Sequence, residues 1–117
     1  MTFYNQNGNA VAYIDDDNET IFLWDGTPVA YLDKENIYGF NGKHLGWFED
    51  GIVWNHNGEK NGFTKKSLPV FSKFEPFKAF KKFKPFKSFK EFAPFKPFKS
   101  SALANLDCNS FLKLGEK

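Results

Sequence analysis

The first 64 residues repeat one pattern four times, and this repetition limits the fold more than any other feature of the sequence. Aligning the chain on Gly8, Gly26, Gly42 and Gly58 gives intervals of 18, 16 and 16 residues. Each glycine follows Asn or Asp, and such pairs are typical of tight hairpin turns because both residues tolerate positive φ. The pattern therefore predicts four β-hairpins, each with a type I′ turn at its Asn-Gly or Asp-Gly pair.

The residues on either side of these turns fall into columns of similar side chains. Three columns are apolar or aromatic, namely Phe3, Ile21, Ile37 and Val53; Tyr4, Phe22, Tyr38 and Trp54; and Tyr13, Tyr31, Trp47 and Phe63. A fourth column is small and contains Ala12, Ala30, Gly46 and Gly62. Because one hairpin is marginal in water, the four must pack together. We expect an all-β fold in which four β-hairpins surround a pseudo-four-fold axis as a shallow barrel, with the small column at the axis and the aromatic column on the other face.

A second repeat, of three residues, fills the segment after the hairpins. Phe stands at every third position from Phe71 to Phe98, and Lys follows seven of these ten Phe residues. Side chains spaced three residues apart do not fall on one side of a helix or of a strand. Four prolines in the segment also oppose a helix. Polyproline II would place the Phe on one ridge and most of the Lys on another. We therefore expect an extended or disordered Phe/Lys/Pro tail.

These patterns divide the chain into three parts. We expect a four-hairpin domain at residues 1–66, the triplet tail at residues 67–101 and a short C-terminal segment at residues 102–117. The apolar stretches at 102–106 and 111–114 of the last segment suit a short helix or a docking peptide.

Charge separates the hairpins from the tail. Residues 1–64 contain three Lys and ten acidic residues, whereas residues 65–100 contain eleven Lys and two acidic residues. The tail is therefore expected to meet an anionic partner or the protein's own acidic domain. The chain has no Arg, which weakens any function that needs bidentate recognition of phosphates or bases.

Composition also bears on the compartment. Cys108 is the only cysteine, so an intrachain disulfide and a Cys-based zinc site are excluded, and a reducing compartment is favoured. The N-terminus lacks the basic and apolar regions of a secretory signal, and no apolar run approaches the roughly 18 residues of a membrane span. The expected location is the cytoplasm, with a peripheral contact to a membrane.

The segment from Tyr4 to Tyr13 shows the repeat most fully, as aromatic-x-x-[Asn/Asp]-Gly-x-x-Val-Ala-Tyr. Four copies of this pattern and a Lys/Pro triplet tail resemble the bacterial four-fold beta-flower domain family. The resemblance covers residues 1 to about 66 and the style of the tail. It implies a shallow symmetric barrel with an apolar centre, similar in shape to tubby-like and scramblase-like domains, and hence an association with lipid or membrane. It implies no catalytic or binding residues.

An exposed ridge of ten Phe needs a covering surface. An anionic membrane would attract the Lys and admit the Phe, and single-stranded nucleic acid, the weakest of the specific alternatives, would stack on the Phe. The tail could also fold along its own barrel or enter a protein groove, or it could be a low-complexity linker without a ligand. The candidate contact residues are Phe71, Phe74, Phe77, Lys78, Phe80, Lys81, Phe83, Lys84, Phe86, Lys87, Phe89, Lys90, Phe92, Phe95, Lys96, Phe98 and Lys99.

Other polar clusters predict less. The acidic run at 15–18 lacks the Gly and Glu of a calcium loop and is expected to be a solvated turn. His44 and His56 would meet only in one strand register and lack a third ligand, so we expect no metal site. The Trp and Tyr residues could cage a cation, but core packing is favoured. The sequence thus predicts a non-enzymatic binding or tethering module without a cofactor, or alternatively a structural or interaction protein whose tail wraps its own or a partner's barrel.

Overall fold

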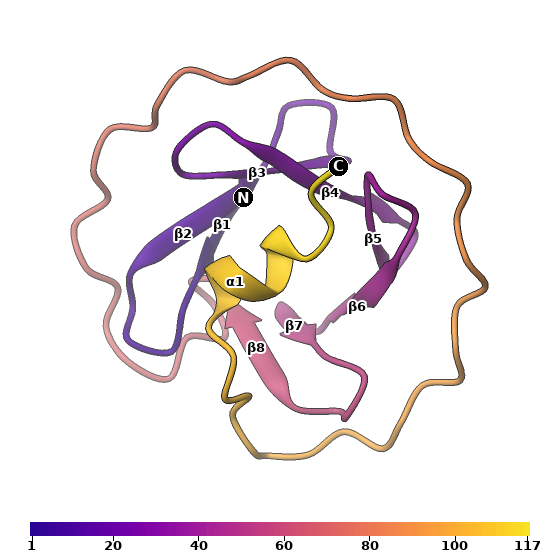
Figure 1. Cartoon of the computed structure of the whole chain (residues 1–117). Coiled ribbons are helices and arrows are strands. Elements are labelled where there is room, and N and C mark those ends of the chain that lie inside the picture. Colours follow the sequence, from indigo (N-terminus) through magenta and orange to yellow (C-terminus); the bar gives the residue numbers. More distant parts are fainter.

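In the computed structural model, which describes residues 1–117, the chain forms a closed antiparallel barrel of eight strands with one short helix. The strands are β1 (Thr2–Tyr4), β2 (Ala10–Ile14), β3 (Thr20–Leu23), β4 (Pro28–Asp33), β5 (Asn36–Gly39), β6 (His44–Glu49), β7 (Ile52–Trp54) and β8 (Lys60–Phe63). Each strand pairs with the next, and β8 returns to β1 through the pair Tyr4↔Phe63. The predicted all-β barrel is confirmed, and closure leaves no open sheet edge (Figure 1).

The turns within the hairpins differ from the predicted type. Gly8, Gly26, Gly42 and Gly58 have φ between +74° and +91°, but the Asn or Asp before each of them does not have positive φ. Each loop is instead a type I turn closed by a left-handed Gly. The prediction of type I′ turns at these pairs was wrong. In each loop the side chain of an Asn or Asp accepts a hydrogen bond from a backbone N–H group, which favours the type I turn. Asn5 Oδ1, for example, accepts hydrogen bonds from the N–H groups of Asn7 and Asn9, both at 3.0 Å.

The two central positive-φ residues of a type I′ turn occur between hairpins. Asp50 and Gly51, which join β6 to β7, have φ of 56° and 73°. The flanking residues Glu49 and Ile52 pair directly, so the connection is a two-residue loop. The second and third connectors are two-residue loops, whereas the first is longer, because Ile14 pairs with Ile21.

The columns seen in the sequence take fixed places in the barrel. Phe3, Ile21, Ile37 and Val53 are fully buried in one core cluster together with Ala12 and Ala30. The strand register shifts immediately after each residue of the first column, at Phe3/Tyr4, Ile21/Phe22, Ile37/Tyr38 and Val53/Trp54. These bulges bend the hairpins at equivalent points and increase their twist, as closure of a small barrel requires.

A short helix, α1 (Cys108–Lys113), contributes to this core from one end of the barrel. Asp107 caps it by accepting a hydrogen bond from the Ser110 N–H at 2.8 Å. Cys108, Phe111 and Leu112 are buried in the same cluster as the strand residues. Figure 1 shows α1 lying across the centre of the strands, so the C-terminal segment is a plug for the barrel.

The two glycines of the small column have no room for a side chain. A Cβ atom on Gly62 would lie 2.8 Å from Cys108 Sγ of α1, whereas one on Gly46 would collide first with the carbonyl oxygen of Trp54 and lie 3.3 Å from the Phe111 ring. The helix therefore accounts for Gly62, and the backbone of Trp54 accounts for Gly46.

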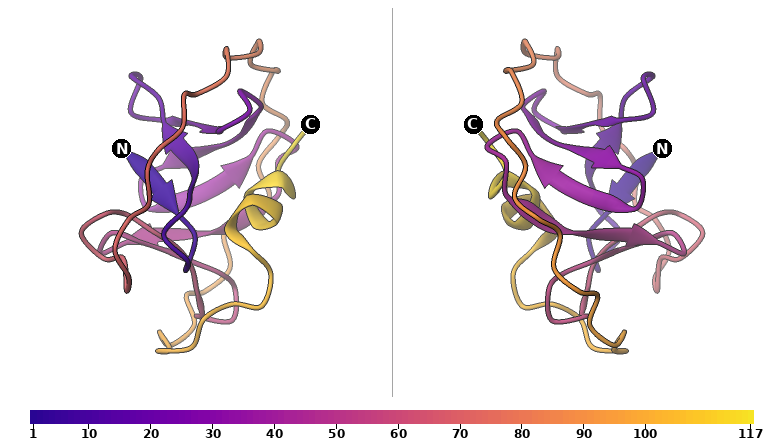
Figure 2. Two further views of the ribbon diagram at one scale, coloured as in Figure 1. Left: turned by 90° about the vertical axis from the view of Figure 1, so that its left-hand side faces the viewer. Right: turned by 90° about the vertical axis from the view of Figure 1, so that its right-hand side faces the viewer.

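The triplet tail encircles the barrel. Residues 71–100, here called the collar, contain no helix or strand, and Figure 1 shows them as a ring around the strands. The side views of Figure 2 show the collar on the outside of the strands and α1 at one end. The molecule is a disc with principal extents of 37 × 36 × 22 Å.

Candidate functional site

An outward-facing belt of aromatic rings lies under the collar. This aromatic belt consists of Tyr4, Tyr13, Phe22, Tyr31, Tyr38, Trp47, Trp54 and Phe63. Rings from adjacent hairpins pair across the strands, with centroids 5.7 Å apart for Tyr13 and Phe22 and 6.1 Å for Tyr31 and Tyr38. No ring of the belt is more than 6% exposed, because the collar covers the belt.

The collar is bonded to the hairpins in steps of nine residues. The N–H groups of Lys73, Lys82, Glu91 and Ser100 donate to the carbonyl oxygens of Gly8, Gly26, Gly42 and Gly58, at 2.9, 2.9, 3.0 and 2.8 Å respectively. Nine residues are three Phe-x-x triplets, so one group of three triplets spans the distance from one hairpin turn to the next. The triplet tail and the hairpin repeat are thus matched to each other.

The turn glycines are needed for this approach. A Cβ atom on Gly8, Gly26, Gly42 or Gly58 would collide with the carbonyl oxygen of Phe71, Phe80, Phe89 or Phe98, again nine residues apart. Each glycine therefore serves twice, because it supplies the left-handed backbone of the turn and admits the collar.

Five lysines of the collar point inward and lie on the aromatic belt. The Nζ atoms of Lys78 and Lys87 are 4.4 and 4.1 Å from the ring centroids of Tyr13 and Tyr31. Lys81, Lys90 and Lys99 lie 5.8, 5.4 and 5.2 Å from Phe22, Tyr38 and Trp54. Both sets follow the nine-residue step, and these distances are typical of cation–π contacts. The rings that could have caged a foreign cation hold the protein's own ammonium groups.

Six collar lysines form ion pairs with acidic residues in or next to the connectors between hairpins. The pairs are Lys81–Asp15 (2.7 Å), Lys84–Asp17 (3.3 Å), Lys87–Glu19 (2.6 Å), Lys90–Asp33 (2.6 Å), Lys96–Glu35 (3.3 Å), Lys96–Glu49 (2.8 Å), Lys99–Glu49 (3.6 Å) and Lys99–Asp50 (3.0 Å). Hydrogen bonds from Lys81 and Lys90 hold the pKa values of Asp15 and Asp33 below their usual range. The acidic half of the chain is thus the partner of the basic half.

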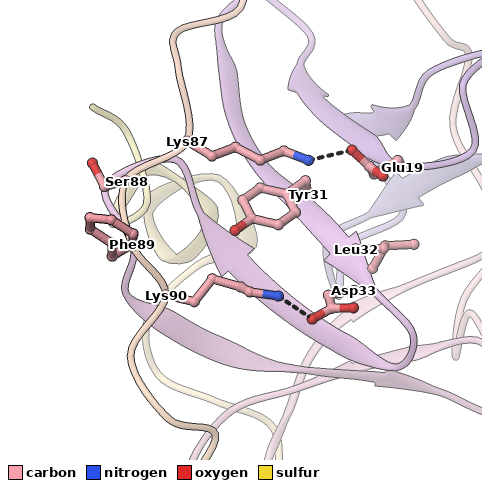
Figure 3. Close-up of a pocket in the computed structure, with 8 residues that line it drawn as sticks. All are labelled: Glu19, Tyr31, Leu32, Asp33, Lys87, Ser88, Phe89 and Lys90. Atoms are coloured by element: carbon pink, nitrogen blue, oxygen red, sulfur yellow. Dashed lines mark hydrogen bonds and ion pairs between the residues drawn. The ribbon is translucent and has the colours of Figure 1, made fainter.

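Figure 3 shows one such unit around a depression of about 530 Å³ between the collar and β4. The Tyr31 ring lies between the Lys87–Glu19 and Lys90–Asp33 ion pairs, while Phe89 points away from the barrel. The depression is lined by paired charges and apolar carbon. It holds no nucleophile beside a base, so it offers no recognisable catalytic arrangement.

The ten Phe residues of the collar point into solvent. Their exposed fractions run from 91% at Phe74 to 102% at Phe77 and Phe89. The collar therefore has two chemically distinct sides, with lysines and backbone against the barrel and phenyl rings outside. The Phe residues among the predicted contact residues therefore face solvent, whereas the ion-paired Lys residues among them face the barrel.

The comparison with known families agrees with this architecture. A family described as 4-fold beta flower protein matches the chain over residues 1–112, which include the hairpins, the collar and most of α1. The chain belongs to the 4-fold beta flower family. No curated protein and no solved structure matches it. The match extends beyond residue 66, where the resemblance based on the hairpin repeat ended. The family description names a fold and no activity.

Specific contacts set the position of the collar on this beta-flower barrel. Tyr4 Oη donates to Glu75 Oε2 at 2.6 Å, and burial followed by this bond raises the pKa of Tyr4 to about 12. Trp24 Nε1 donates to the carbonyl of Pro76 at 3.0 Å. Glu91 accepts from Tyr38 Oη through its carbonyl and from the His44 N–H through its carboxylate. Because these contacts are not repeated around the ring, they oppose a shift of the collar by one nine-residue step.

The two histidines of the beta-flower chain do meet. His44 Nδ1 lies 2.9 Å from His56 Nε2, and His44 Nε2 lies 3.0 Å from Asn36 Oδ1. Since the Asn oxygen can only accept, His44 Nε2 carries the proton and Nδ1 accepts from His56. There is no cluster of three or more His, Cys, Asp or Glu residues that could hold a metal ion. The pair is thus a hydrogen-bonded structural contact that faces Glu91.

This histidine pair predicts a pH-dependent stability. Burial, and then the neighbouring His56, lower the pKa of His44 from 6.5 to about 4. Between these values the unfolded chain binds a proton that the folded chain does not, so the free energy of unfolding falls as the pH falls from about 6.5 to 4. Urea unfolding at pH 7 and pH 4.5 should show a smaller pH effect in His44→Gln than in the wild type. Equal effects in the two proteins would contradict the assignment.

The single thiol, Cys108, lies on α1 and is buried in the core cluster. Burial raises the pKa of Cys108 to about 12, and the residue is 1% exposed. A buried thiol of this kind does not act as a nucleophile.

The sequence contained the signal for the collar, although the triplet period concealed it. Pro76, Pro85 and Pro94 are nine residues apart, which divides the tail into groups of three triplets. The role of the turn glycines as acceptors had no comparable signal.

Proposed function

We propose that this protein is a non-enzymatic tethering module that binds acidic membrane surfaces through the first part of its tail. The observation that carries the proposal is a group of lysines without ion-pair partners beside exposed apolar side chains. The lysines are Lys65, Lys66 and Lys73, and the apolar side chains are Met1, Val70, Phe71 and Phe74. We call this group the basic edge.

The rest of the collar is less suited to an acidic surface. All collar lysines from Lys81 onward except Lys82 form ion pairs with carboxylates of the barrel. The collar runs as a ring around the barrel (Figure 1), and its Phe side chains are at least 91% exposed, so a flat bilayer can meet only one arc of them at a time. Lys78 and Lys82 form no ion pair but contact Tyr13 and Thr27 of the barrel, so the basic edge is the arc on which lysines without a barrel contact lie next to phenyl rings.

The expected energies suit a reversible contact. A Lys near an anionic leaflet contributes about 1 kcal/mol, and full burial of a Phe side chain contributes roughly 1.5–3 kcal/mol. Three lysines and two partly inserted Phe residues are enough for peripheral attachment. No helix of the structure has the length and apolar character needed to cross a bilayer.

Vesicle flotation tests the proposal. At low salt the full-length protein should float with vesicles rich in phosphatidylserine and remain unbound to phosphatidylcholine vesicles. Replacing Lys65, Lys66 and Lys73 together by Ser should weaken binding on the order of 100-fold, since about 3 kcal/mol is lost. Phe71→Ser/Phe74→Ser should weaken it to a similar extent.

A matched pair of Phe residues supplies the control. Phe92 and Phe95 are as exposed as Phe71 and Phe74 but lie elsewhere on the collar. Phe92→Ser/Phe95→Ser should therefore float like the wild type. If both double variants lose binding equally, the basic edge is not the contact, and if the wild type ignores acidic vesicles at low salt, the tethering function is refuted.

A second candidate function is that of an interaction protein that wraps its own barrel and offers the Phe ring to a protein partner. It is supported by the ion pairs and by the nine-residue series of backbone bonds between collar and barrel. Suppose that the wild-type protein does not bind vesicles and that its collar amides are protected from hydrogen exchange. This second candidate accounts for both results, and the first does not.

A further inference from the structure

The collar and the barrel recognise each other through a repeated unit. The tail divides into three nine-residue groups, at 71–79, 80–88 and 89–97, each with Phe at its first, fourth and seventh positions. In each group the first residue lies against a turn glycine, and the third residue of that group donates its N–H to the carbonyl of the same glycine. The second and eighth positions of the middle group are Lys81 and Lys87, which cover Phe22 and Tyr31.

The Phe side chains take no part in this recognition. They are at least 91% exposed, so the barrel binds only the backbone, the lysines and a few third-position residues of the collar. Because the main contacts recur at each hairpin, the surface of one hairpin accepts a nine-residue group largely by its shape and charge. The barrel surface is therefore a receptor for extended, lysine-bearing segments with small or Pro residues between them.

We infer that this receptor also accepts the tail of a second copy of the chain, so that copies exchange collars. The second copy carries the segment whose backbone and charges complement the belt, and every contact made within one chain can be made between two. Exchange of identical elements retains the native contacts and costs mainly the entropy of association. The inference does not depend on membrane binding.

The dimensions allow such an exchange. A nine-residue group in an extended conformation spans about 28 Å at 3.1 Å per residue. The disc is 22 Å thick and 36–37 Å wide, so one group can pass from a hairpin of one barrel to a hairpin of an adjacent barrel. The remaining groups and α1 then occupy the neighbour, which gives up its own tail in return.

Isotope mixing tests the exchange on the full-length protein. Copies labelled with 14N and 15N are unfolded in urea, mixed, refolded together over a range of concentrations and treated with a carbodiimide that joins lysines to adjacent carboxylates. Mass spectrometry then follows the Lys90–Asp33 and Lys81–Asp15 linkages. The inference predicts mixed-isotope linkages whose share rises with concentration towards the statistical half. Linkages of a single isotope at every concentration would overturn it.

Two variants distinguish collar exchange from random contact between copies and from membrane binding. Copies with Lys81→Ser/Lys90→Ser/Lys99→Ser should not place their tails on wild-type barrels, which is read from the Lys87–Glu19 and Lys96–Glu49 linkages that they can still form. Phe71→Ser/Phe74→Ser copies should exchange as the wild type does. Mixed linkages from Lys34 or Lys43, which lie on the barrel and form no ion pair, would report random collision. If they match the mixed collar linkages in abundance, the inference fails.

Discussion

Replacing Phe111 by Ala is expected to lower the free energy of unfolding by about 3–5 kcal/mol. Phe111 is 5% exposed within the core cluster, and its ring lies against the position where Gly46 has no side chain. Its removal leaves a cavity between α1 and the barrel that the short helix cannot fill. For a chain of this size the loss corresponds to a fall in Tm of roughly 10–20 °C, which calorimetry or circular dichroism would measure.

Phe92→Ala is the matched control, because Phe92 is 100% exposed on the collar and touches no core residue. Its Tm should stay within about 2 °C of the wild-type value, since exposed substitutions change stability little. In Phe111→Ala, Cys108 should also react with a thiol reagent much faster than in the wild type, because the plug opens more often. Equal Tm losses in the two Phe variants would show that α1 is not part of the core.

The second large effect is expected for Gly26→Ala. Gly26 has a φ of +91°, which costs an L-residue roughly 1–2 kcal/mol, and the added Cβ would collide with the carbonyl of Phe80. The collar must then leave the turn and lose the bond from the Lys82 N–H to the Gly26 carbonyl. Tryptic cleavage after the neighbouring lysines should accelerate at least about tenfold, in proportion to the open population.

Gly51→Ala separates turn strain from loss of the collar. Gly51 also has positive φ, at +73°, but its nearest neighbours are side chains of Thr64 and Ser67 rather than the collar. Both variants should lose stability, while only Gly26→Ala should expose the collar to trypsin. Rapid cleavage in Gly51→Ala under native conditions, or slow cleavage in Gly26→Ala, would contradict the role of the turn glycines.

The hairpins could be predicted because their determinants are local. An Asn-Gly or Asp-Gly pair fixes a reversal of the chain, and the alternation of side chains then places Phe3, Ile21, Ile37 and Val53 on the buried face. The turn type was mispredicted because Asn-Gly suits both a type I′ turn and a type I turn with a left-handed Gly. The distinction depends on side-chain bonds such as those of Asn5, which the pattern does not reveal.

The collar could be predicted only in part, because its conformation is set by a surface that the tail sequence does not contain. The triplet period predicted different directions for Phe and Lys. It did not reveal that nine residues match the distance between turns such as Gly26 and Gly42, since that distance is a property of the closed barrel. The aromatic columns were expected to pack or to cage a ligand, and they instead underlie the lysines of the same chain.

The plug had the weakest signal. Asp107 three residues before Ser110 is a helix cap that could have been noticed, but a helix of six residues has no reliable periodicity. The Gly in place of Ala at position 62 becomes meaningful only when Cys108 of α1 is seen to fill that space.

Amide hydrogen exchange measured by NMR tests the central claim most directly. If the tail is held as a collar, the N–H groups of Lys73, Lys82, Glu91 and Ser100 exchange slowly, because each donates to a turn glycine. The amides of Phe74, Phe83 and Phe92, which follow the first three of these and have no such bond, should exchange much faster, giving protection that recurs every nine residues. Exchange of the whole stretch from residue 71 to residue 100 at the rate of an unstructured peptide would contradict the account.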